Sequence, residues 1–121
     1  MVESAWPKEA IPDDAVLYMR LHRMWMKDGV PIPGAFRNIV DGMSTDWDRY
    51  STPEETRQRA KVPVDNAVIT LVAGQVGAIP GQSVEHAPLP DNRAHTNVVG
   101  EKSPQARLMF LRLYRMVIPL T

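Results

Sequence analysis

The residues best suited to chemistry gather between positions 92 and 104. This stretch, NRAHTNVVGEKSP, brings basic and polar side chains together just before a strong helix start at Ser103 and Pro104. Arginine and lysine bind anions, and the unpaired backbone N–H groups at a helix start can complete an anion site. We therefore expect a site for a nucleotide or other phosphate-containing ligand, with the ligand-binding residues Arg93, His95, Lys102 and Ser103.

Acid–base catalysis is a second use of the same stretch. Imidazole titrates near neutral pH, so His95, or alternatively His86, is a candidate catalytic residue, with Asp46 as its candidate partner. Glu101 and Thr96 occupy positions where a phosphate-binding loop needs glycine. No serine has the surroundings of a nucleophile elbow, and no dinucleotide fingerprint is present. The sequence leaves open whether the protein is an enzyme.

Metal binding has little support in the sequence. The chain has no cysteine, which excludes disulfides, thiolate catalysis and cysteine-ligated metals. A histidine site would combine His86 and His95 with Glu85 or Asp91, and this spacing matches no compact zinc pattern. His22 is remote from these residues in the sequence. We therefore expect neither a metal site nor a cofactor.

Composition and charge restrict the class of protein. The 121 residues suffice for one domain, and 44% hydrophobic with 23% charged residues is typical of a globular fold. Fourteen basic residues balance fourteen acidic ones, so no overall field attracts nucleic acid or a membrane surface. The sequence begins without the features of a signal peptide, and no apolar run reaches the roughly 18 residues of a membrane span. We expect a soluble cytoplasmic protein.

Alternation and β-branched residues predict several strands. Residues 16–23 alternate between apolar and polar types, as a half-buried strand does. Its two faces would carry Leu17, Met19 and Leu21 on one side and Tyr18, Arg20 and His22 on the other. Residues 67–72 are continuously apolar or β-branched, which suits a strand covered on both faces. Further strands are expected at 82–86 and 95–99.

Local signals also predict short helices. The tetrapeptide Thr52-Pro53-Glu54-Glu55 is a capping box, so a short exposed helix should run from Pro53 to about Ala60. Residues 73–79 fit a short helix weakened by two glycines. Residues 43–50 fit a single helical turn capped by Ser44.

The longest helix is expected near the C-terminus, from Gln105 to about Ile118. Ser103 caps it, Pro104 is its first residue and Pro119 stops it. Its core face would carry Ala106, Met109, Phe110, Leu113, Tyr114 and Val117. The other side mixes leucines with arginines and is too apolar for a fully solvated face. These side chains would cover a neighbouring strand or form a partner interface of Leu108, Leu111, Arg112 and Arg115.

Together these elements predict one α+β domain. We expect a small mixed sheet, with the C-terminal helix packed on it and one or two short helices. Residues 15–121 would form the globular domain, and residues 1–14 an irregular N-terminal arm pinned by Trp6.

Three segments carry a resemblance to known sequences. Asp14–Arg23, Asp41–Glu55 and Asn92–Lys102 are similar to segments of small uncharacterised bacterial proteins, and the second reads DGMSTDWDRYSTPEE. The resemblance implies a bacterial or phage origin. It implies no fold, activity or functional residue.

Three hypotheses of function follow. The first is a non-catalytic protein-interaction or regulatory module of a bacterial or phage complex, whose partner is another protein or a second copy of the chain. The alternative is a small enzyme or binding protein for a nucleotide or other phosphate-containing ligand, using Arg93, His95, Lys102 and Asp46. The third is a nucleic-acid binder that uses the arginines of the C-terminal helix, Arg107, Arg112 and Arg115.

Overall fold

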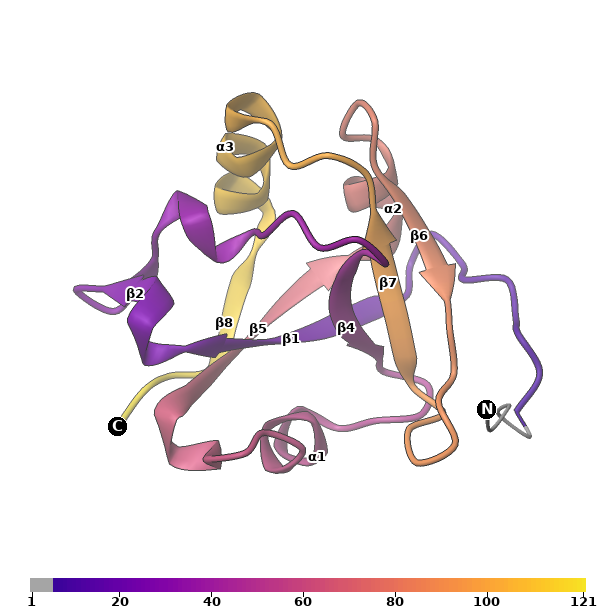
Figure 1. Ribbon diagram of the computed structural model, residues 1–121, viewed down its shortest axis with the longest axis horizontal. Helices are drawn as coiled ribbons and strands as arrows, with labels where there is room; N and C mark the ends of the chain where they lie inside the picture. The colour runs from indigo at the N-terminus through magenta and orange to yellow at the C-terminus, as the bar shows by residue number, and fades with distance from the viewer. Residues whose placement is uncertain (1–5) are drawn as a thin grey trace.

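The computed structural model describes residues 6–121, which form a six-stranded sheet, a small hairpin and three α-helices (Figure 1). The strand order is β6-β7-β4-β1-β5-β8. The strands of the sheet are β1 (Val16–His22), β4 (Met43–Trp47), β5 (Asn66–Val72), β6 (Ser83–His86), β7 (His95–Val99) and β8 (Arg115–Ile118). The hairpin is β2 (Met26–Lys27) with β3 (Val30–Pro31), and the helices are α1 (Pro53–Gln58), α2 (Ala73–Gly77) and α3 (Pro104–Leu113).

The α+β class is confirmed, but the sheet is antiparallel throughout and not mixed. Neighbouring parallel strands need a long crossover connection, usually a helix. Residues 87–94, which join β6 to β7, are too few for such a crossover. The longest helix, α3, carries the chain from β7 to the opposite edge of the sheet at β8, so these two strands are not neighbours.

One face of the sheet carries the main core. The predicted alternation of β1 is confirmed, because Leu17, Met19 and Leu21 are buried. Figure 1 shows α2 and α3 on one side of β1 and α1 on the other. From α3, Phe110 is fully buried and stacks on Phe36, with ring centroids 4.9 Å apart.

The C-terminal helix is shorter than expected. It ends at Leu113, and residues 115–118, predicted as helix, instead form β8 against β5. Two local causes favour the strand: Tyr114 is extended (φ −64°, ψ 154°), and Pro119 disfavours the helical region for Ile118. Pairing with β8 also satisfies the backbone groups along the outer edge of β5.

The two short predicted helices are present. The capping box of α1 is confirmed: the Thr52 hydroxyl accepts from the backbone N–H of Glu55 at 3.1 Å, and the Glu55 carboxylate accepts from the N–H of Thr52 at 3.0 Å. Residues 73–77 form α2. By contrast, the helical turn expected near Ser44 is wrong, because β4 pairs there with β7. Strand β7 pairs with the backbone N–H and C=O groups of residues 43–46, whereas a single helical turn would leave most of them unpaired.

The sheet opens between β1 and β4. Strand β1 pairs with β5 along its whole length, but with β4 only at Leu17–Trp47 and Tyr18–Asp46. Beyond Tyr18 the two strands diverge, and β4 curves away from β1 (Figure 1). Within residues 6–121, none of the helices has the length and apolar character needed to cross a bilayer.

The packing of α3 on the core predicts unequal effects for substitutions at two of its residues. Phe110→Ala removes a fully buried ring and should lower the free energy of unfolding by about 3–5 kcal/mol. Leu108→Ala, on the exposed side of the same helix, should change it by less than about 0.5 kcal/mol. Urea denaturation of both variants measures the difference, and equal losses would contradict this packing.

Candidate functional site

A cleft of about 570 Å³ lies where β1 and β4 diverge. This volume suits a small organic ligand. Side chains from β1, β4, β5 and β7, from the residue after α1 and from two loops line it. They include Arg20 and His22 from β1, Ser44 and Asp46 from β4, and Trp25, Arg37, Arg59, Asn92 and His95 from the surrounding segments.

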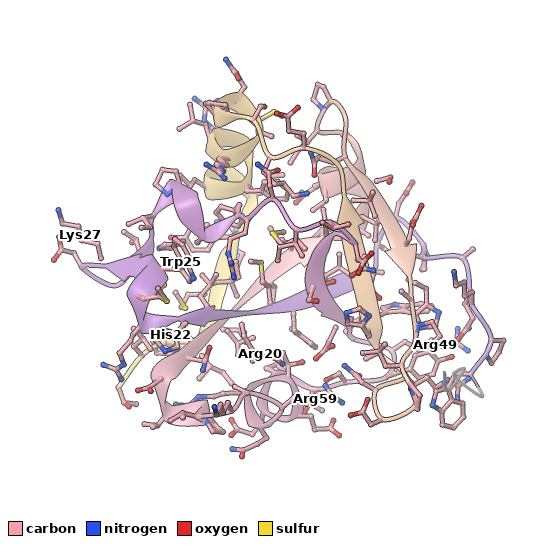
Figure 2. The ribbon with its side chains drawn as sticks, viewed as in Figure 1. Arg20, His22, Trp25, Lys27, Arg49 and Arg59 are labelled. Atoms are coloured by element: carbon pink, nitrogen blue, oxygen red, sulfur yellow. The ribbon has the colours of Figure 1, made fainter. Side chains whose placement is uncertain are left out.

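Arg20 places a positive charge on the face of β1 opposite the core. Figure 2 shows it with Arg59 in the space between β1 and α1. Its Nη1 donates to the backbone carbonyl of Thr56 at 2.8 Å, and among residues 6–121 it forms no ion pair with a carboxylate. Burial lowers the pKa of Arg20, nearby Asp46 raises it, and nearby Arg59 lowers it. The result is a partly desolvated cation that borders the cleft.

Asp46 is the buried centre of the polar network beside Arg20. Its carboxylate accepts from the hydroxyl of Thr56, from Nη1 of Arg59 and from Nδ2 of Asn92, each at 2.8 Å. These contacts join β4 to α1, to the residue after α1 and to the turn before β7. Asp46 thus neutralises Arg59 and holds it beside Arg20.

A second cavity of about 360 Å³ continues the cleft on the α1 side. Both cavities are lined by Arg20, His22, Arg59 and Asn66, and the second adds Lys61. Among the described residues that line this second cavity, three are arginine or lysine and none is a carboxylate. Such a concentration of positive charge favours an anion. We call this cavity the basic lobe.

The larger cavity offers different chemistry. Trp25 is half-buried at its wall, and the guanidinium carbon of Arg37 lies 5.4 Å from the Trp25 ring centroid. Apolar side chains share the same cavity: Met19, Ala35, Ile39, Met43 and Leu89. Aromatic and apolar walls with a few polar groups are typical of sites for ring-bearing small molecules. We call this cavity the main lobe.

Ser44 and His95 form a hydrogen-bonded pair on the main lobe. The Ser44 hydroxyl lies 3.0 Å from Nε2 of His95, and Nδ1 of His95 lies 2.8 Å from the carbonyl oxygen of Ala87. A carbonyl oxygen only accepts, so Nδ1 carries a proton, and in neutral His95 Nε2 holds a lone pair. The Ser44 hydroxyl is therefore the donor to His95.

Of the four residues predicted to bind ligand, only His95 lines the cleft. Arg93 lies over the rings of Tyr50 and Trp6, at 4.1 and 4.7 Å from their centroids, and pairs with Glu9 at 3.8 Å. These contacts fasten the described part of the N-terminal arm to the domain.

The remaining two predicted ligand-binding residues have structural contacts. Lys102 is buried, and its Nζ donates to the carbonyl oxygens of Val98 at 3.1 Å and Gly100 at 2.6 Å. The Ser103 hydroxyl accepts from the N–H of Ala106 at 3.1 Å, which caps α3. The chain turns away from the cleft after β7, so neither side chain reaches it.

Three of the four predicted interface residues are exposed, and the fourth is half-buried. Leu108 is 55% exposed, and Arg112 and Arg115 are exposed, whereas Leu111 is half-buried against the core. Arg115 belongs to β8 and not to α3, so the arginines do not form the single helical stripe that the sequence predicted.

Several residues of the cleft were missed by sequence reasoning. Arg20 and His22 had a signal, because the alternation of β1 places them on the face opposite the core. Arg59 and Lys61 follow a short helix and had none. Ser44 had none either, since its partner His95 is 51 positions away and is brought close only by the pairing of β4 with β7.

Comparison with protein-family models, with curated proteins and with solved structures finds no match for this chain. Within residues 6–121, no three histidine, aspartate or glutamate side chains gather closely enough to hold a metal ion.

The Asp46 network predicts a large effect for a small change. Asp46→Asn keeps the side-chain shape but removes the charge that faces Arg59 in a largely buried setting. We expect the free energy of unfolding to fall by about 2 kcal/mol or more. The matched control is Asp65→Asn, which breaks the exposed pair with Arg23 and should cost less than about 1 kcal/mol. Similar losses in chemical denaturation would contradict the central role of Asp46.

The burial of Lys102 predicts a pH dependence of stability. Burial lowers the pKa of Lys102 from 10.5, so below 10.5 the unfolded chain binds more protons at this residue than the folded chain does. Stability from this residue therefore rises with pH between the lowered value and 10.5. Relative to Lys102→Met, the wild type should gain free energy of unfolding across this window. Denaturant titrations at several pH values measure it, and a constant difference would contradict the prediction.

Proposed function

We propose that the protein binds a small phosphate-bearing ligand of nucleotide size in the cleft between β1 and β4. The observation that carries this proposal is Arg20, a partly buried guanidinium that borders both lobes without an ion pair among the described residues. Arginine recognises phosphate through its planar fork of donors. A phosphate group would supply the negative charge that Arg20 lacks.

The division of the cleft supports an orientation for this ligand. The basic lobe gathers Arg20, Arg59 and Lys61 with no carboxylate among its lining residues, so the phosphate belongs there. The main lobe contains Asp91 as well as Trp25, and its acidic side chain disfavours a phosphate at that end. The uncharged, ring-bearing part of the ligand would lie against Trp25 and the apolar wall.

The lining of the cleft changes the set of residues that we propose to bind the ligand. His95 remains in the proposed site. Asp46 supports the site by holding Arg59 in place. Arg93, Lys102 and Ser103 are replaced by Arg20, Arg59 and Lys61, because these three line the basic lobe.

A protein-interaction role is a second proposal, and one observation favours it. On α3, Leu108 is 55% exposed and Met109 is 38% exposed, next to the exposed Arg112. Exposed apolar side chains beside an arginine are common in protein interfaces. The half-burial of Leu111 makes this surface smaller than the sequence suggested, so it ranks below the cleft.

Binding of nucleotides tests the leading proposal. Isothermal titration with nucleoside mono- and diphosphates should detect binding that weakens with added salt, whereas the matching nucleosides should bind much more weakly. Arg20→Met removes the charge at similar length and should weaken nucleotide binding about tenfold or more.

The matched control is Arg23→Met. Arg23 lies three positions along the chain, pairs with Asp65 and does not line either lobe. The Arg23→Met variant should bind nucleotides with the affinity of the wild type. Arg20→Lys keeps the charge and should retain part of the affinity, which separates loss of charge from loss of folding. Absence of binding by every nucleotide tested, or wild-type affinity in Arg20→Met, would contradict the proposal.

A further inference from the structure

We propose that Ser44 is a catalytic nucleophile with His95 as its general base, and that the pair hydrolyses a carboxylic ester of an anionic alcohol bound in the cleft. The substrate class rests on the proposed function, because it takes the anionic group from the basic lobe. The nucleophile and base rest on their own geometry, which is independent of the arginines.

The proton positions favour this role. Since the Ala87 carbonyl fixes the proton of His95 on Nδ1, the Nε2 lone pair faces the Ser44 hydroxyl at 3.0 Å. A serine that donates to an unprotonated imidazole nitrogen is set to lose its proton as it attacks. The base is in turn oriented by a third group, here a backbone carbonyl.

Both residues are held by regular structure. His95 is the first residue of β7, and its own carbonyl oxygen accepts from the N–H of Ala87 at 2.9 Å. Ala87 therefore contacts both the backbone and the ring of His95. Ser44 is exposed between the buried residues Met43 and Thr45 of β4, so its backbone is fixed while its hydroxyl is accessible. Sites on strands are held more precisely than sites on loops.

The other serine and histidine side chains have different surroundings. His86 uses both ring nitrogens, one accepting from the N–H of Glu9 at 3.0 Å and the other 2.7 Å from the carbonyl oxygen of Arg93. His22 accepts from the N–H of Met24 at 3.1 Å. The Ser51 hydroxyl is buried and engaged by Thr56 and Arg59. Ser44 with His95 is the serine–histidine contact of residues 6–121 that faces a cavity.

The lining of the cleft points to a carboxylic ester. The main lobe contains Ile39, Met43 and Leu89, which can accept an apolar acyl group. The basic lobe can hold the anionic group of the alcohol, as argued above. An ester that spans the two lobes would bring its carbonyl carbon into the lobe that Ser44 lines.

The reaction needs only water as a second reactant. Ser44 Oγ bonds to the ester carbonyl carbon while its proton passes to Nε2 of His95. The bond from that carbon to the alcohol oxygen then breaks, and the departing oxygen takes the proton from His95. Water repeats the sequence on the acyl-serine: its oxygen bonds to the carbonyl carbon, His95 takes its proton, and Ser44 Oγ leaves and regains that proton. Arg20 and Arg37 line the same lobe as Ser44, and their positive charges would favour the oxyanion of each tetrahedral intermediate.

A fluorophosphonate probe tests the nucleophile directly. Ser44 Oγ would displace fluoride from phosphorus, and mass spectrometry would place the adduct on Ser44. Ser44→Ala should abolish this adduct, and His95→Gln should slow labelling about 100-fold or more, the usual contribution of a general base. The matched control Ser83→Ala alters an exposed serine of β6 and should label as the wild type does. The same variants should rank in the same order for hydrolysis of 4-nitrophenyl acetate.

The outcomes separate this inference from the proposed function. Ser44→Ala should bind inorganic pyrophosphate as the wild type does, because Ser44 does not line the basic lobe. If nucleotides bind through Arg20 but no adduct forms on Ser44, the nucleophile is overturned and the binding site stands. If Ser44 is labelled but no phosphate-bearing ligand binds, the nucleophile stands and the anionic ester is overturned.

Discussion

The hydrogen bonds of one buried carboxylate, Asp46, organise the polar half of the molecule. Strands β1 and β4 pair at only two positions, so the β ladder between them does little to fix β4 relative to α1. Asp46 sits at the last of these pairs and accepts from Thr56, Arg59 and Asn92. A carboxylate buried in this way is tolerated because three donors replace its water shell. The same bonds keep α1 over the sheet and leave the cleft open.

An asymmetry of charge follows from this arrangement. Asp46 neutralises Arg59 but forms no ion pair with Arg20, so the α1 side of the cleft keeps an excess of positive charge. On the other side, Asp46 lies opposite His95 in the β4–β7 pair, which brings His95 within reach of Ser44. An anion-attracting lobe and a serine–histidine pair therefore border one cleft, although no contact between them is needed for either. Both features depend on the position of Asp46, which pairs with Tyr18 of β1 on one side and with His95 of β7 on the other.

The sequence predicted best those features that depend on residues a few positions apart. The capping box at Thr52, the Ser103 cap and the alternation of Leu17, Met19 and Leu21 are all local, and all are confirmed. The strand at residues 115–118 was missed because its helical pattern is overridden by the free edge of β5. Most of the cleft was missed because its contacts join distant segments, such as Arg20 with the Thr56 carbonyl, 36 positions away. A polar cluster in the sequence around His95 indicated a site, but strand direction decided which of its members reach it.

The most direct test of the central claim is an NMR titration of the wild-type protein with inorganic pyrophosphate, observing backbone amides and arginine side chains. Pyrophosphate should cause the largest shift changes at Arg20, Arg59 and Lys61, with the side-chain signals of Arg20 the most affected. Smaller changes should reach the network around Asp46. If pyrophosphate shifts no cleft signal, or acts mainly on the arginines of α3, the basic lobe is not an anion site and the account is contradicted.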